Sequence, residues 1–159
     1  LLALHDQLEM VKHQILDADR RILAWHSSSK VSQRLDDIPG VGPLIATALV
    51  ASVPDPHAFK SGRDLAAWIG LVPRQNSTGG KERLGRISKQ GDPYLRWLLV
   101  AGAMSVIRQG RKTDFAKMPW LAELMARKPT KVAAVALANK TARIAWALLS
   151  NGETYRRSV

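Results

Sequence analysis

The chain has 159 residues and carries 24 lysine and arginine residues against 13 acidic ones, a formal net charge of +11. With 46% apolar residues it can bury the core of one ordinary domain, which excludes a disordered basic tail, and the absence of cysteine excludes disulfides, thiolate zinc sites and a cysteine nucleophile. The longest charge-free stretch, residues 38–54, is too short to span a membrane, and no signal-peptide pattern is present, so we expect a cytoplasmic protein with no membrane partner.

The positive charge is concentrated in the second half of the chain. Residues 1–37 have a net charge of −1, residues 38–73 are neutral, and residues 74–159 hold 17 basic and five acidic residues, a net charge of +12. Such asymmetry in a chain with ordinary apolar content is typical of a folded surface for a polyanion, most often nucleic acid. The alternative is a folded protein that is basic without such a partner.

Residues 1–34 are predicted to form a coiled-coil helix. Apolar residues recur at spacings of three and four, as in a heptad a/d stripe: Leu1, Leu4, Leu8, Val11, Ile15, Ala18, Ile22 and Trp25. So narrow a stripe favours pairing with another helix, so we expect a homo-oligomer or an antiparallel helix from outside the chain. His5, His13 and His26 are expected on the solvated face, because no further ligands cluster with them at metal-binding spacing.

Residues 35–53 resemble a helix-hairpin-helix motif, because IPGVGPLIATAL combines Gly-x-Gly with a following alanine-rich helix. Gly40 and Gly42 are expected to adopt positive φ in a tight hairpin, and Pro43 suits the first turn of the next helix. Unpaired N–H groups at the start of that helix would let Gly40, Val41 and Gly42 hold a DNA phosphate without reading bases. A purely structural helical hairpin is the alternative, because the turn has no lysine or arginine.

A short helix and then a long polar loop are expected next. Ser61 is placed as the N-cap of a capping box, and the helix that it opens is expected to end at Gly70. Residues 73–93 are glycine-rich, basic and too long for a simple turn, which favours a functional loop. Extended pieces at residues 71–72 and 84–87 are placed to pair as a short β-hairpin.

Apolar helices are predicted after the loop. The first has Asp92 as its N-cap and Pro93 at its first position, and it is expected to end at Gly110. The second is expected from Pro119 to residue 126. The third is expected over residues 131–150, with Thr130 as its cap. All five tryptophans fall within expected helices, where core or interface anchors are favoured over base-stacking platforms: Trp25, Trp68, Trp97, Trp120 and Trp146.

The predicted fold class is mainly α. A coiled-coil helix over residues 1–34 precedes a compact helical domain over residues 35–155. That domain is expected to contain the helix-hairpin-helix at about 35–53, a polar basic loop at about 73–93 with a possible β-hairpin, and apolar helices at about 93–150.

Three blocks of the sequence carry a resemblance to a known family. They read IPGVGPLIATAL, SGRDLAAWIGLVPRQNSTGGKERLGRISKQGDPYLRWLLVAGA and KVAAVALANKTARIAWALL, in that order. Together they resemble the insertion-sequence one-ten/one-eleven (Piv-like, DEDD) transposases, over about residues 35–149. The leading coiled coil also fits this family.

The resemblance implies recombination of double-stranded DNA at insertion sites, guided in some members by a structured RNA from the element. Family members join an N-terminal RuvC-like domain, whose acidic residues bind a divalent metal such as Mg²⁺, to a C-terminal transposase domain with a serine nucleophile. The serine block corresponds to QNSTGG here. It assigns the nucleophile to Ser77, with Ser88 as the second choice and Thr78 as a more distant one.

The residue types in the loop agree with that chemistry. Attack of a serine hydroxyl on a phosphodiester forms a phosphoserine, which conserves the bond for rejoining. Charge that grows on the phosphate oxygens calls for fixed cations. Six basic residues in or near the loop are the candidates for phosphate binding: Arg74, Lys81, Arg83, Arg86, Lys89 and Arg96.

Nothing in the chain resembles the RuvC-like half, so we expect no metal site and no other cofactor here, with Mg²⁺ in an N-terminal domain outside the chain. The expected partner is double-stranded DNA, with a structured guide RNA and a second copy through the coiled coil as further expectations. We expect the chain alone to bind DNA and not to cleave it. The alternative is a non-catalytic helix-hairpin-helix module that binds nucleic acid, or a protein partner through its coiled coil.

Overall fold

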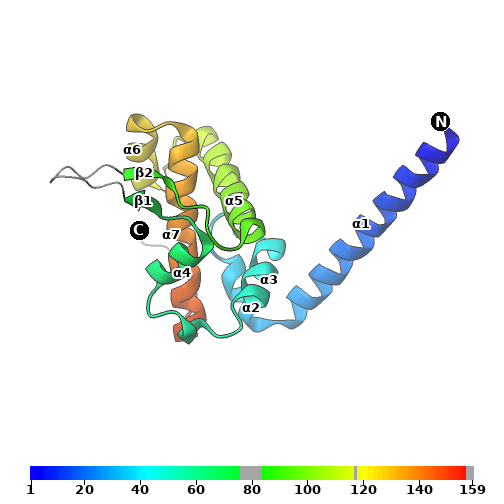
Figure 1. Cartoon of the computed structure of the whole chain (residues 1–159), viewed down its shortest axis with the longest axis horizontal. Helices are drawn as coiled ribbons and strands as arrows, with labels where there is room; N and C mark the ends of the chain where they lie inside the picture. The colour runs from blue at the N-terminus through cyan, green and yellow to red at the C-terminus, as the bar shows by residue number, and fades with distance from the viewer. Residues whose placement is uncertain (76–83, 117, 157–159) are drawn as a thin grey trace.

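The computed structural model describes residues 1–75, 84–116 and 118–156. They form a long N-terminal helix and a compact helical body with a two-stranded sheet (Figure 1). In chain order the elements are α1 (Leu2–Ser28), α2 (Lys30–Asp36), α3 (Pro43–Ser52), the 3-10 helix η1 (Pro56–Ala58), α4 (Gly62–Ile69), β1 (Pro73–Gln75), β2 (Leu84–Ile87), α5 (Pro93–Lys112), α6 (Pro119–Arg127) and α7 (Thr130–Asn151). The mainly α architecture is therefore confirmed.

Helix α7 is the central helix of the body and contacts α4, α5 and α6. Its inward face is rich in small residues, with fully buried alanines at positions 133, 134, 138, 142 and 145 beside larger side chains such as Leu137 and Leu148. These small side chains let the neighbouring helices approach closely, and Leu65, Leu95 and Leu99 of α4 and α5 complete the core. By length and composition α7 is apolar enough to cross a membrane, and its place in the core accounts for that composition.

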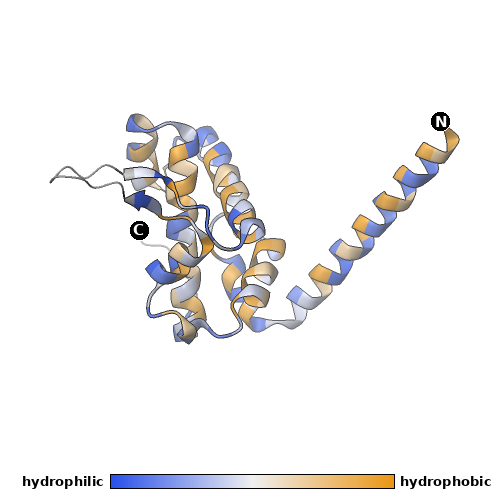
Figure 2. Ribbon diagram, in the orientation of Figure 1, coloured by the Kyte–Doolittle hydropathy of each residue, from blue (hydrophilic) through white to orange (hydrophobic). Residues whose placement is uncertain are grey.

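Helix α1 projects from the body, with its N-terminus at the far end (Figure 1). Apolar and polar residues alternate along it (Figure 2), and Leu4, Leu8, Val11 and Ile15 are between 46% and 66% exposed. Only its C-terminal part reaches the body, at α2 and α3. The predicted helix is confirmed, and coiled-coil pairing of its apolar stripe stays a prediction.

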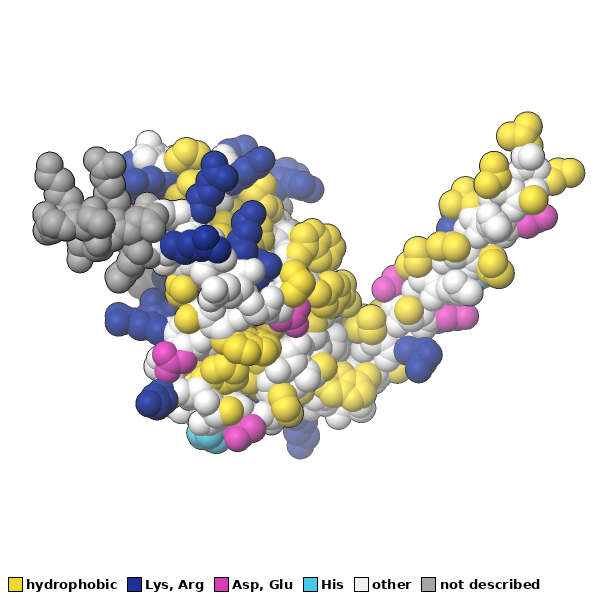
Figure 3. Space-filling model, viewed as in Figure 1, with side chains coloured by type: hydrophobic (Ala, Val, Ile, Leu, Met, Phe, Trp, Pro, Cys, Tyr) yellow, Lys and Arg dark blue, Asp and Glu magenta, His cyan; other side chains and the backbone are white. Residues whose placement is uncertain are grey.

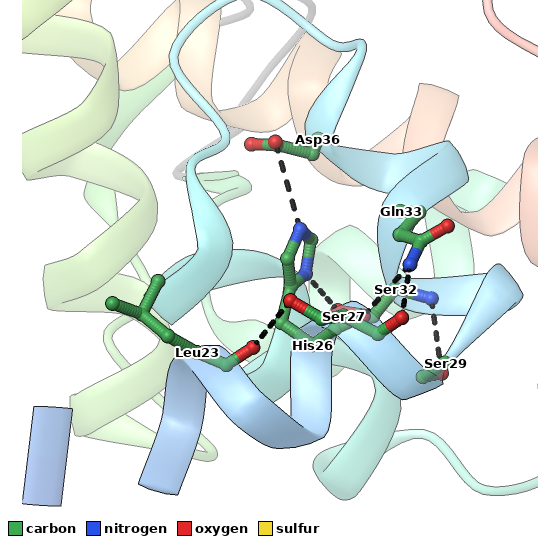
Figure 4. Close-up of polar contacts among 7 residues, drawn as sticks. All are labelled: Leu23, His26, Ser27, Ser29, Ser32, Gln33 and Asp36. Atoms are coloured by element: carbon green, nitrogen blue, oxygen red, sulfur yellow. Dashed lines mark hydrogen bonds and ion pairs between the residues drawn. The ribbon is translucent and has the colours of Figure 1, made fainter. Parts of the chain in front are cut away.

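The junction of α1 and α2 is held by His26, which is buried; its predicted solvated position is wrong. His26 Nδ1 lies 2.8 Å from Ser32 Oγ, and Nε2 lies 3.7 Å from Asp36 Oδ2 (Figure 4). The Ser29 hydroxyl accepts a hydrogen bond from the Ser32 N–H and so caps α2. Because Ser29 starts a new helix, the single helix expected over residues 1–34 is two helices.

Residues 37–42 connect α2 and α3 and lie against the middle of α5. Gly40 has a φ of +84°, and a Cβ there would lie 2.8 Å from the Gly102 carbonyl oxygen. Gly42 has a φ of −97° and a ψ of −179°, so the positive φ predicted for it is wrong. The left-handed residue of this loop is Gly40, and Gly42 is already the extended N-cap of α3.

Two helix ends differ from the prediction. Helix α5 continues through Gly110 to Lys112, and Gly110 makes room for the ring of Phe115, whose N–H donates to the Gly110 carbonyl at 2.9 Å. Thr130 is the first residue of α7 and not its cap, which is Pro129. The Thr130 hydroxyl instead accepts a hydrogen bond of 2.7 Å from Arg111 Nη2.

Of the five tryptophans, only Trp146 packs against the hydrophobic core, and none is fully buried. Trp25, Trp68, Trp97 and Trp120 are between 38% and 62% exposed. Trp146 is half-buried, and its Nε1–H donates to the Pro56 carbonyl at 2.9 Å. A role as interface anchors stays a prediction for the exposed four.

Candidate nucleic-acid interface

A short antiparallel hairpin carries the basic loop. Strand β1 pairs with β2, with Pro73 opposite Ile87 and Gln75 opposite Leu84, and the register is irregular between these pairs. The strand expected at residues 71–72 therefore begins two residues later. The predicted residues Ser77, Thr78, Lys81 and Arg83 lie outside the described residues.

The base of the hairpin is fastened to the end of α4 by backbone hydrogen bonds. The Ser88 N–H donates to the Val72 carbonyl at 2.8 Å, and the Lys89 N–H donates to the Gly70 carbonyl at 3.2 Å. Arg74 Nη2 donates to the Ser88 carbonyl at 3.1 Å, which ties the two strands together by a side chain. These contacts fix where β2 ends relative to the body.

Two glycines allow the backbones to meet at this point. Gly70 and Gly91 both have left-handed φ, of +83° and +82°. A Cβ on Gly91 would collide with the Trp68 carbonyl oxygen, and a Cβ on Gly70 would collide with the Gln90 carbonyl oxygen. Gly91 was not among the predicted turn residues, although a glycine directly before the Asp92–Pro93 helix start is a signal for such a turn.

Arg96 is half-buried in the first turns of α5, and its side chain is used within the protein. Its Nη1 donates to the Ile69 carbonyl at 2.8 Å and to the Gln90 carbonyl at 3.1 Å. The Ile69 carbonyl belongs to the last turn of α4, where backbone acceptors lack helical partners. The structure thus places Arg96 as a clamp between α4 and the 88–91 turn, while its predicted contact with a phosphate stays untested.

Replacing Arg96 by alanine is expected to lower the free energy of unfolding by about 1–3 kcal/mol, because two carbonyl acceptors lose a charged donor. Urea denaturation measures this, and faster hydrogen exchange of the Ser88 and Lys89 amides should accompany it. An unchanged stability, combined with a DNA affinity whose salt dependence falls, would instead identify Arg96 as a phosphate ligand.

Of the two serines proposed as nucleophiles, Ser77 and Ser88, the structure describes only Ser88. Ser88 Oγ is buried and has no hydrogen-bond partner among the described residues. A hydroxyl without accessible surface cannot meet a phosphate in this conformation, which disfavours Ser88. Ser77 lies outside the described residues, so its assignment continues to rest on the sequence resemblance.

Three cations of the hairpin lie at the protein surface, where a polyanion could reach them. Arg74, Arg86 and Lys89 are exposed, and no carboxylate in the described ranges forms an ion pair with them. Lysine and arginine side chains gather on the part of the body that carries the hairpin (Figure 3). The same ranges hold no cluster of three His, Asp or Glu residues that would suit a metal ion.

The Gly-x-Gly loop and the hairpin base both rest on α5. Gly40 lies against Gly102, and the hairpin turn is held by Arg96, about 9 Å away along the helix axis. Val41 is buried, and its N–H donates to the Ile38 carbonyl at 2.9 Å. The Val41 amide is therefore occupied within the loop, whereas its predicted neighbours Gly40 and Gly42 are partly exposed.

A family model provides the decisive comparison. The model described as the Transposase IS116/IS110/IS902 family matches residues 32–117, more than half of the chain. The chain belongs to this transposase family. The match covers most of α2, the Gly-x-Gly loop, the hairpin and α5.

Individual relatives are similar to the chain over most of its length. A probable family 20 transposase of Pseudomonas aeruginosa is 50% identical, with 98% of this chain and 46% of that protein aligned. The transposase for insertion sequence element IS1111A of Coxiella burnetii is 44% identical, with 98% and 43% aligned. The pilin gene-inverting protein of Moraxella bovis is 26% identical over 79% of this chain and 38% of its own length. The chain thus spans less than half the length of these curated relatives.

Proposed function

We propose that this chain is the DNA-binding and nucleophile-bearing part of an insertion-sequence transposase that cuts and rejoins DNA strands through a phosphoserine intermediate. The observation that carries the proposal is the set of exposed hairpin cations, which form no ion pair within the described ranges and flank the segment that holds Ser77. Membership of a transposase family supports it.

The proposed step is balanced without an external energy source. Ser77 Oγ attacks the phosphorus of a phosphodiester, a bond from Oγ to phosphorus forms, and the bond from phosphorus to the leaving DNA oxygen breaks. The hydroxyl proton ends on that leaving oxygen. Rejoining is the reverse reaction, in which a DNA hydroxyl attacks the phosphoserine. Arg74, Arg86 and Lys89 would stabilise the negative charge on the phosphate oxygens.

The divalent metal expected for the family does not fit the described part of this chain. No cluster of three potential ligands occurs there, so no step of the chain's own chemistry is derived through a metal. We place double-stranded DNA as the partner of the hairpin. A structured RNA, and a second copy paired through the exposed stripe of α1, are further proposals.

Removal of single hairpin charges tests the DNA contact. Arg86→Gln and Lys89→Gln are each expected to weaken binding of duplex DNA about threefold to tenfold, and to lower the slope of log affinity against log salt by about 0.9. Fluorescence anisotropy over a salt series measures both quantities. Lys12→Gln is the matched control, because Lys12 is exposed on α1 and pairs with Glu9 at 2.7 Å. Equal slopes for all three variants would contradict the proposed interface.

A further inference from the structure

A shallow trough lies on the exposed side of α7, next to α6. It has a volume of about 490 Å³. Lys140 and Arg143 project from its α7 wall, and Trp120 of α6 lies opposite. Ala136 and Ala147 line it as well, one turn before and one turn after the two cations, and their small side chains keep it open.

The two cations of the trough have no acidic partner among the described residues. Both are exposed, in a helix that is otherwise almost free of charge. Lys140 Nζ lies 4.5 Å from the centroid of the Trp120 ring. This cation–π contact holds the ammonium group at the trough, and it covers one face of the Trp120 ring.

The trough is connected to the hairpin at one side and to α4 at the other. Asn139, another lining residue, donates from Nδ2 to the Leu71 carbonyl at 3.2 Å, two residues before β1 begins. The start of α4 packs on the backbone of Arg143, since a Cβ on Gly62 would lie 3.0 Å from Arg143 Cα. These direct contacts therefore fix the position of the trough relative to the β1–β2 hairpin.

We propose that this trough binds the sugar–phosphate backbone of duplex DNA and extends the surface that begins at the hairpin. The inference rests on the proposed function, in which the hairpin contacts DNA. Lys140 and Arg143 are separated by about 4.5 Å along α7, comparable with the axial spacing of about 3.4 Å between phosphates of one strand. Since Lys140 already covers one face of the Trp120 ring, the trough suits a backbone of paired DNA better than unstacked bases.

Lys140 and Arg143 were not among the residues predicted to bind phosphate. The available signal was a basic pair spaced by three in a helix of otherwise apolar and small residues. That pattern predicts two cations on one face, but it does not say that α6 and the chain leading to β1 border them.

Neutral variants of the two cations test the proposal in the intact chain. Lys140→Gln and Arg143→Gln are each expected to weaken binding of a fluorescent duplex about threefold to tenfold and to lower the salt slope by about 0.9. Lys12→Gln and Arg20→Gln, exposed on α1 and paired with Glu9 and Asp17, are the matched controls. A second test is Ala136→Glu, which places a carboxylate in the trough and should weaken binding further. Unchanged affinity and slope in all three trough variants would overturn the proposal.

The outcomes separate this inference from the proposed function. If hairpin variants weaken binding and trough variants do not, the inference fails and the hairpin interface stands. If trough variants alone weaken it, the trough is supported and the hairpin assignment fails. A structured RNA stem-loop is the second probe. If the trough variants lose affinity for this RNA only and bind duplex DNA as before, the assignment of the trough to DNA is overturned.

Discussion

Replacing Ser77 by alanine is expected to abolish the covalent protein–DNA adduct in a full-length transposase that contains this chain. The alanine has no oxygen to attack phosphorus, so adduct formation should fall by at least about a thousandfold. Denaturing gel electrophoresis with labelled DNA measures the adduct. Duplex affinity should stay unchanged, because the substitution removes no charge.

The remaining hydroxyl candidates supply the controls for this experiment. Ser88→Ala and Thr78→Ala should retain the adduct. Loss of the adduct in Ser88→Ala, with Ser77→Ala active, would transfer the nucleophile to Ser88 and require its buried hydroxyl to become exposed. If the full-length protein binds duplex DNA but forms no adduct even with all its serines present, the chain is the non-catalytic binding module.

Gly102→Ala is expected to destabilise the fold by about 3 kcal/mol or more. The added Cβ would collide with the Gly40 carbonyl oxygen and would lie 2.9 Å from Ile45 Cδ1. Alanine gains about 1 kcal/mol over glycine within a helix, but a clash with backbone cannot be relieved by a change of rotamer. Urea denaturation followed by circular dichroism measures the change in the free energy of unfolding.

Gly42→Ala is the matched control for this prediction. Gly42 belongs to the same loop as Gly40, and its φ is −97°. No atom of the described residues lies within 4 Å of the position that a Cβ would take there. The free energy of unfolding of the Gly42→Ala variant should differ from that of the unchanged protein by less than about 0.5 kcal/mol. Equal stability of the Gly102 and Gly42 variants would show that the loop yields readily and does not constrain α5.

The helices were predictable because their ends carry local chemistry. Ser61 and Asp92 accept hydrogen bonds from the amides two or three residues onward, and Gly70 and Gly152 end their helices in the left-handed conformation. Each of these is a short-range signal that a sequence displays directly. The compact helical body follows from the apolar periodicity between such caps.

The features that the sequence does not reveal depend on how the elements pack against one another. Nothing near His26 along the chain indicates that α2 returns to bury it, and nothing near Gly110 shows that Phe115 covers it. An arginine beside a basic loop suggests a phosphate ligand, yet Arg96 Nη1 donates to two backbone carbonyls, which lie 27 and six residues away in the sequence. The assignment of Ser77 stays a prediction, since it rests on the resemblance alone.

The projecting helix has a mechanical consequence. Helix α1 contains 27 residues, which corresponds to a length of about 40 Å. A tilt of about 10° at the junction with α2 would therefore displace its tip by roughly 7 Å. The contacts of His26 with Ser32 and Asp36 thus act at the fulcrum of a lever arm. A small change in the angle between α1 and α2 would therefore change the distance between the hairpin and any molecule bound to the N-terminal end of α1.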